Sequence, residues 1–251
     1  MRQIASYRTD QHFNMRVFIT ILFIIGIVFG SVDFKYAGGW PNSSSTKHTD
    51  VSIQLDCPGN PGCDCDDNTS CKDSSCIKHF KGNFCSLQEG DYFPSFKAYD
   101  QFGDIVSIHD FANQNKYILI EMGAAWCGPC RMLADWFSYG IEDLKSKPFW
   151  KNEYDMIYDL VRNEQIYFIT IIYEDEFRDN STQYTCEEWY NNYPDEFIPI
   201  LADENKYLHK IIKPTGIPAI SLLNDQMQII TLSTRGFNKA FDKLIELKLD
   251  Q

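Results

Sequence analysis

The chain has 251 residues, enough for one sizeable domain with accessory segments or for two ordinary domains. Hydrophobic residues make up 44% of it and aromatic residues 15%, so a packed core is expected and disorder of the whole chain is excluded. The formal net charge of -12 argues against nucleic acid as a partner, because a phosphate backbone requires a basic surface.

An apolar run at residues 17–32 follows three arginines, Arg2, Arg8 and Arg16. A basic segment ahead of an apolar one is the pattern of an export signal. As a helix the run would reach only about 24 Å, short of the roughly 30 Å hydrocarbon core of a bilayer. We therefore expect residues 1–32 to be a cleaved signal peptide. The alternative is an uncleaved anchor that would tether the chain to a membrane. Either way the rest of the chain is expected to be extracytoplasmic, in the periplasm or secreted.

Cysteine usage agrees with that location, since disulfides are rare where thiols are kept reduced. After a turn-rich linker at residues 33–56, six of the nine cysteines lie within residues 57–86. This segment has too few apolar residues for a core, so we predict a small unit held together by disulfides. A metal site and a thiol relay remain as alternatives. Six cysteines allow fifteen pairings, and we assign none of them.

Apolar runs and helical patterns alternate over residues 87–251, which is typical of an α/β domain. The predicted elements, in chain order, are strands at 96–99 and 105–108 joined by a turn, a buried strand at 117–122, a helix from 127 to 144 ending at Lys147-Pro148, a helix within 149–165, a strand at 166–173, a helix opened by a capping box at 185–188, a strand at 197–201, a helix at 205–212, strands at 219–223 and 229–234, and a helix at 238–247.

The motif Trp126-Cys127-Gly128-Pro129-Cys130 follows the buried strand. On the first turn of a helix this spacing brings the two sulfurs within disulfide reach. Free backbone N–H groups at a helix start favour a thiolate, so Cys127 is the expected nucleophile and Cys130 the resolving cysteine. A zinc site would need a second pair of ligands, and the cysteine-rich segment is distant and self-contained. We predict a redox pair and no metal. The remaining cysteine, Cys186, is expected to be buried.

Residues from about Gly90 to Leu247 resemble the thioredoxin superfamily, and most closely its exported TlpA-like and ResA-like thiol–disulfide oxidoreductases. Residues 117–130 and the tetrapeptide Gly216-Ile217-Pro218-Ala219 carry most of the resemblance. It implies a thioredoxin-like fold, with a central mixed sheet flanked by helices, preceded by the small disulfide-rich segment. It implies no dissociable cofactor. It also marks residues 149–165 and 174–196 as longer than the fold requires.

The resemblance also implies roles for individual residues. Ile217 and Pro218 occupy the place of the cis-proline loop, which in that family packs against the active cysteines and pairs with substrate main chain. Glu121 occupies the place of a buried acid that moves protons to and from the resolving cysteine. A carboxyl group in an apolar strand has a raised pKa, which suits acid–base work. The other interpretation is a carboxylate that faces solvent or pairs with a lysine.

The predicted function is exchange of disulfides with extracytoplasmic protein clients, as a reductant that receives electrons from an upstream redox protein. Trp126, Gly128 and Pro129 are expected to contact the client, together with the 217–218 loop. Two alternatives stay open. One is a non-catalytic exported binding or assembly protein that uses the cysteine-rich segment. The other is a thiol peroxidase, which would need a Thr-x-x-Cys motif that residues 120–130 lack.

Overall fold

The computed structural model describes residues 55–72, 74–79 and 82–249. The predicted export segment at 1–32 and nearly all of the predicted linker at 33–56 lie outside these ranges. Among the helices that are described, none has both the length and the apolar character needed to cross a membrane.

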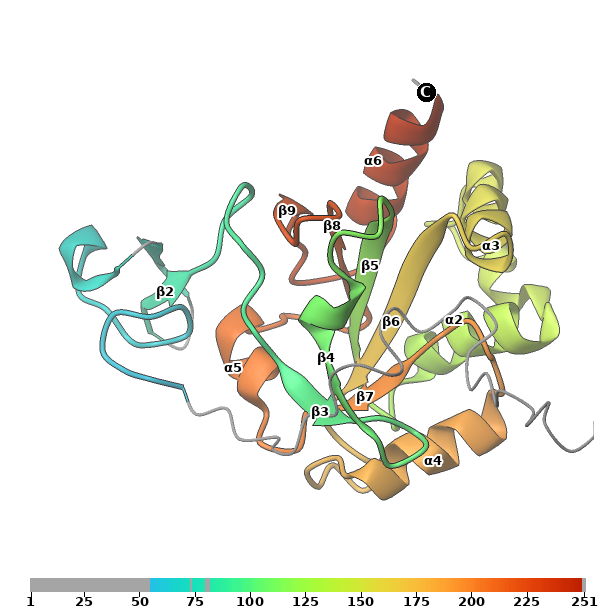
Figure 1. The fold of residues 1–251 in the computed structure, drawn as a ribbon, viewed down its shortest axis with the longest axis horizontal. Coiled ribbons are helices and arrows are strands. Elements are labelled where there is room, and N and C mark those ends of the chain that lie inside the picture. Colours follow the sequence, from blue (N-terminus) through green and yellow to red (C-terminus); the bar gives the residue numbers. More distant parts are fainter. Residues whose placement is uncertain (1–54, 73, 80–81, 250–251) are drawn as a thin grey trace, which may run out of the picture. The chain divides into compact units, whose positions relative to one another are not determined.

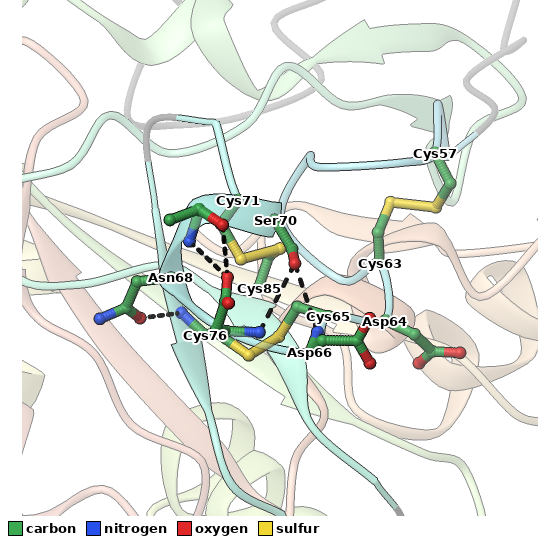
Figure 2. Close-up of a disulfide and its surroundings, with 12 residues drawn as sticks. Cys57, Cys63, Asp64, Cys65, Asp66, Asn68, Ser70, Cys71, Cys76 and Cys85 are labelled. Atoms are coloured by element: carbon green, nitrogen blue, oxygen red, sulfur yellow. Dashed lines mark hydrogen bonds between the residues drawn. A yellow bond between two sulfur atoms is a disulfide. The ribbon is translucent and has the colours of Figure 1, made fainter.

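The cysteine-rich segment contains little regular structure: the short 3-10 helix η1 (Asn68–Ser70) and the antiparallel strands β1 (Ser75–Ile77) and β2 (Phe84–Ser86). Three disulfides join its six cysteines, pairing Cys57 with Cys63, Cys65 with Cys76 and Cys71 with Cys85 (Figure 2). The prediction of a disulfide-stapled segment is confirmed. Because all six sulfurs are bonded in pairs, none of them is a thiol in this state.

A mixed five-stranded sheet forms the centre of the following domain, in the order β7-β6-β5-β8-β9 (Figure 1). Strands β5 (Tyr117–Gly123), β6 (Ile166–Ile172) and β7 (Ile200–Ala202) run parallel, whereas β8 (Ala219–Leu223) is antiparallel to β5, and β9 (Ile229–Thr231) to β8. Every residue of β6 and all but the first of β5 are buried, as expected for parallel strands covered on both faces. The predicted mixed sheet is confirmed.

In the part of the chain that the structure describes, five α-helices accompany the sheet: α2 (Gly128–Tyr139), α3 (Asp155–Arg162), α4 (Gln183–Asn192), α5 (Tyr207–Ile212) and α6 (Asn238–Leu249). Side chains alternate between the two faces along β5. Leu119 packs in one core with residues of α2, α3 and α6, while Ile118, Ile120 and Met122 pack in a second core with residues of α4 and α5. Glu121 therefore lies on the face that α2 covers.

The predicted hairpin ahead of the sheet is present as β3 (Lys97–Tyr99) and β4 (Ile105–Ser107). Its turn is held by Asp100, whose carboxylate accepts hydrogen bonds from the backbone N–H groups of Phe102 and Asp104. Short 3-10 helices complete the described elements: η2 (Ile108–Phe111), η3 (Glu142–Ser146) and η4 (Asn152–Tyr154).

Two predicted helix boundaries were wrong. The helix that starts at the motif ends at Tyr139 instead of near residue 147, because Gly140 adopts a left-handed conformation with φ of 66° and terminates it. Helix α4 is capped by Thr182, not Thr185. The Thr182 side chain accepts the N–H of Thr185, and the Thr185 hydroxyl accepts the N–H of Thr182, so Thr185 lies inside the first turn.

Two predicted strands are shorter than expected. Strand β7 starts at Ile200, not at residue 197, because Pro199 has no N–H to contribute to a ladder. Strand β9 ends at Thr231, not at residue 234. The carbonyl of Thr234 instead accepts hydrogen bonds from the N–H groups of Thr215 and Gly216, in the loop that leads to β8.

Candidate active site at the start of helix α2

The Trp-Cys-Gly-Pro-Cys motif forms the turn from β5 into α2. Cys127 is the N-cap residue of α2, and its Sγ accepts a hydrogen bond from the backbone N–H of Cys130 at 3.2 Å. Pro129 is in the first turn, where its missing N–H leaves no helical bond unmade. The two cysteines form a disulfide with an S–S distance of 2.24 Å. Once reduced, the sulfur of Cys127 would lie where N–H groups and the helix dipole stabilise a thiolate.

The disulfide is largely covered in this state. Cys127 is 1% exposed and Cys130 is fully buried, whereas Gly128 and Pro129 between them are exposed. Trp126 is half-buried. The surface that the motif presents to a partner is therefore made by the dipeptide and the edge of the tryptophan.

The loop before β8 lies at the same end of the sheet as the motif. Met122 pairs with Ala219 in the antiparallel β5–β8 ladder, and this is the last pair at the C-terminal end of β5. Pro218, which precedes Ala219 in the chain, therefore lies next to that end of β5. The Ile217–Pro218 peptide bond is cis, and the carbonyl of Pro218 accepts the N–H of Gly236 at 2.7 Å. Pro218 is buried and Ile217 half-buried. The fold thus brings both residues to the end of β5 where the motif begins.

Glu121 is buried in the sheet, with 3% of its surface exposed. Its Oε2 accepts a hydrogen bond from Oγ1 of Thr170 at 2.8 Å, while Oε1 finds no hydrogen-bond partner among the described residues. Burial raises the pKa of Glu121 to about 7, and the Thr170 hydrogen bond opposes this without overcoming it. The carboxyl group does not face solvent, and it pairs with no lysine of the described ranges. It can change its protonation near neutral pH.

Gly123 lies between this carboxyl group and the sulfur of Cys130. A Cβ atom added to Gly123 would be 3.5 Å from Cys130 Sγ and 3.5 Å from Glu121 Oε1. The sulfur and the oxygen are therefore separated by no more than 7.0 Å, twice the 3.5 Å distance. The structure places the predicted acid near the predicted resolving cysteine.

Trp126 is held by a network of side chains that was not predicted from the sequence. Its Nε1 donates to Oε2 of Glu174 at 2.8 Å, and Lys206 forms an ion pair with Oε1 of the same carboxylate at 2.7 Å. The Arg178 guanidinium lies 3.8 Å from the centre of the indole ring, a cation–π geometry. These partners are 48 or more positions from Trp126, and no local pattern marks them. The nearest signal in the sequence was an acidic residue two positions after the end of β6.

The segment between β6 and β7 also forms a pocket next to the motif. Arg131, one residue beyond Cys130, pairs with Glu176 at 2.7 Å and donates to the carbonyl of Ala125. The pocket measures about 370 Å³. Its lining residues are Ala125, Arg131, Asp175, Glu176, Thr185, Glu188, Trp189, Asn192 and Tyr193. The longer segment at 174–196 therefore shapes the surface on one side of the motif.

Residues 100–187 match the thioredoxin family model, a range that includes β5, the motif and β6. With the sheet order and helices described above, this match shows that the chain has a thioredoxin-like fold. No curated protein matches the chain in sequence.

Solved structures with distant similarity include three thioredoxin-like proteins. A thioredoxin-like protein from Bacteroides caccae is 14% identical over 64% of this chain and 50% of its own, with a TM-score of 0.45. The chain thus spans half the length of that protein. The thioredoxin domain of a thiol-disulfide oxidoreductase from Bacteroides vulgatus is 19% identical over 64% of this chain and 99% of its own, with a TM-score of 0.43. An exposed lipoprotein thioredoxin from Streptococcus pneumoniae is 14% identical over 61% and 99%, with a TM-score of 0.42.

Proposed function

We propose that the chain is a thiol–disulfide oxidoreductase that exchanges disulfides with protein clients outside the cytoplasm. The observation that carries the proposal is the Cys127–Cys130 disulfide at the N-terminus of α2, with the Cys130 N–H directed at the Cys127 sulfur. A pair in this position can open and close reversibly. The reaction needs no cofactor beyond the two sulfurs.

In the reducing direction, the thiolate of Cys127 attacks a client disulfide and forms a mixed disulfide, which releases one client thiolate. The Glu121 carboxylate takes the proton of Cys130, and the resulting thiolate attacks the Cys127 sulfur. The client leaves as a dithiol after taking protons from solvent, and the Cys127–Cys130 disulfide closes. Two electrons pass to the client, and an upstream redox protein must return them. A Glu121 pKa of about 7 suits this proton transfer at neutral pH.

The client is expected to bind across the exposed Gly128-Pro129 dipeptide, with Trp126 on one side and the main chain of Ile217 on the other. All four lie at the end of β5 where α2 begins. The pocket formed by residues 174–196 lies next to this surface, and so we assign it to client selection. The cysteine-rich segment agrees with an oxidising compartment, since its six cysteines form three disulfides. Residues 1–32 would supply the export signal or a membrane tether.

Two cysteine variants test the reaction. Cys130→Ser should trap a covalent complex with a client, because the mixed disulfide cannot be resolved, and Cys127→Ser should trap nothing and reduce no insulin. Cys186→Ser is the matched control, since Cys186 is a buried thiol outside the motif and its loss should leave both results unchanged. Trapping or reduction that survives in Cys127→Ser would refute the proposed reaction.

The reducing direction has its own test. A Cys-Gly-Pro-Cys pair that acts as a reductant should equilibrate with glutathione at a potential near that of thioredoxin, roughly −270 mV, and not near the −120 mV of a strong oxidant. A potential near −120 mV would mean that the protein oxidises its clients instead of reducing them, although the disulfide exchange itself would be unchanged.

A further inference from the structure

The pocket beside the motif borders both ends of the redox pair. Of its lining residues, Ala125 lies two positions before Cys127, and Arg131 directly follows Cys130. An extended client advances by about 3.3 Å per residue, so side chains within about two positions of a client cysteine bonded to Cys127 can reach the pocket. With a volume of about 370 Å³, the pocket is large enough for one long side chain.

The charged side chains that line the pocket are three carboxylates and one guanidinium. Arg131 is neutralised by Glu176, with which it forms an ion pair of 2.7 Å. Asp175 and Glu188 then remain without a cation among the described residues that line the pocket. Their hydrogen-bond donors are neutral: backbone N–H groups at Oδ1 of Asp175, and the Tyr184 hydroxyl at Glu188. The pocket is therefore negatively charged.

Two aromatic residues also line the pocket, Trp189 in α4 and Tyr193 directly after it. Their rings pack on each other, with centroids 4.8 Å apart. Trp189 is 5% exposed, so the core holds its ring in place. The faces of aromatic rings attract cations, and they also cover the hydrocarbon stems of lysine and arginine. Rings beside carboxylates therefore suit a long cationic side chain.

Other occupants fit these groups less well. A metal ion needs several ligand atoms that converge on one point, and within the described ranges the acidic groups of the pocket form no such cluster. Asp175 and Glu188 repel an anion. An apolar side chain takes water from both carboxylates without replacing it. An organic cation compensates the charge and also contacts the rings.

We propose that this pocket selects clients that carry a lysine or arginine within about two residues of the cysteine that Cys127 attacks. The inference rests on the proposed function and names the chemistry of its substrate. The cation pairs with Glu188 and Asp175, while its hydrocarbon stem lies on the rings of Trp189 and Tyr193. Helix α4 and the loop before it thereby add specificity to a redox pair that can attack any accessible disulfide.

Single-cysteine peptides joined by a disulfide to a chromophoric aryl thiol test this preference. The aryl thiolate is the better leaving group, so Cys127 of the reduced full chain bonds to the peptide sulfur, and release of the aryl thiolate reports the rate. Cys130 then frees the peptide thiol and closes the Cys127–Cys130 disulfide, so a single turnover needs no other reductant.

Two such peptides differ only beside the cysteine, where one has lysine and the other its uncharged analogue norleucine. The second-order rate constant should be about fivefold higher for the lysine peptide, from one exposed ion pair and one cation–π contact. Most of this advantage should be lost at high salt, because salt screens an exposed pair.

Variants of α4 test whether the preference comes from the pocket. Glu188→Gln removes one charge with little change in shape, so the ratio of the two rate constants should fall to about twofold. Glu187→Gln is the matched control, because Glu187 is an exposed neighbour that does not line the pocket. It changes the net charge equally and should keep the wild-type ratio, which separates the pocket from the general field of a chain with a net charge of -12. Glu188→Lys should make the norleucine peptide the faster one.

The two proposals fail in different ways. If wild type reacts equally fast with both peptides, or if Glu188→Gln and Glu188→Lys keep the ratio of Glu187→Gln, the pocket does not select a cation and the oxidoreductase stands. If Cys127→Ser releases the aryl thiolate as fast as wild type does, the proposed function is wrong. A ratio that falls only in the Glu188 variants supports both proposals.

Discussion

Thr170 on β6 donates a hydrogen bond of 2.8 Å to Glu121 on β5, across a parallel ladder in which the two residues are direct partners. Burial and this hydrogen bond act on the Glu121 carboxyl group in opposite directions. Burial is the larger effect, and the pKa rises to about 7. Thr170 thus opposes the rise in the pKa of Glu121, and it helps to set the pH at which Glu121 can accept a proton.

Replacing Thr170 by valine tests this relationship. Valine has nearly the same shape but cannot donate, so the charged carboxylate loses its partner and the pKa of Glu121 should rise above its wild-type value. The acid limb of the pH profile for mixed-disulfide resolution should then move to higher pH, as measured by stopped-flow kinetics between pH 5 and pH 9. Thr170→Ser keeps the hydroxyl and should restore the wild-type profile. An unchanged profile in Thr170→Val would remove Thr170 from the acid–base chemistry.

Glu121 should also make stability depend on pH. Its pKa in the folded state, about 7, is above its ordinary value of 4.5, so the folded state binds the proton more tightly than the unfolded state does. This contribution is fully present below pH 4.5 and is lost as pH rises through 7, at a cost of about 3 kcal/mol. Glu121→Gln should abolish that loss.

Urea unfolding at pH 4.5 and pH 8 measures the effect in both proteins. Asp203, whose pKa burial raises to about 6, contributes with the same sign to each, so the difference between the two proteins isolates Glu121. Parallel stability curves for wild type and Glu121→Gln would show that Glu121 is not protonated near neutral pH in the folded chain.

The Glu174 carboxylate should matter for activity through Trp126. Glu174→Ala removes both the acceptor for the indole N–H and the partner of Lys206, which leaves Trp126 less firmly placed beside the redox pair. We expect kcat/KM for a protein disulfide to fall about threefold to tenfold, a loss of roughly 1 kcal/mol that is typical of one hydrogen bond. Glu174→Gln keeps an acceptor oxygen and should lose less. Equal losses in the two variants would mean that the ion pair, and not the indole contact, is important.

The cysteine-rich segment should depend on its disulfides more than on packing. Replacing Cys71 and Cys85 together by serine opens a bridge between residues 14 positions apart. A disulfide that closes a loop of this length stabilises the folded state by about 3 kcal/mol, which is a large amount for a segment with so few buried apolar residues. Hydrogen exchange should then become fast in the β1–β2 ladder but remain slow in β5, which serves as the internal reference. Slow exchange in both would show that packing maintains the segment without this bridge.

Elements that are specified by their own residues could be predicted from the amino-acid pattern. Strands β5 and β6 are recognisable as continuous apolar runs, and the redox pair as two cysteines at a helical spacing. The cysteine-rich segment was predicted to need disulfides because it lacks apolar residues. The end of α2 could also have been predicted from Gly140, since glycine readily adopts the left-handed conformation that ends a helix, whereas the predicted end was Lys147-Pro148. In each case the information lies within a few residues of the feature.

Contacts between groups far apart in the chain could not be predicted in this way. Thr170 reaches Glu121, and Glu174 reaches Trp126, because β5 and β6 are neighbours in one register; a slip of one residue would turn each side chain to the opposite face. The pairing of six cysteines among fifteen alternatives and the pocket beside Arg131 depend likewise on how segments far apart in the chain pack. Such contacts arise from packing between elements, which the pattern within a single element does not record.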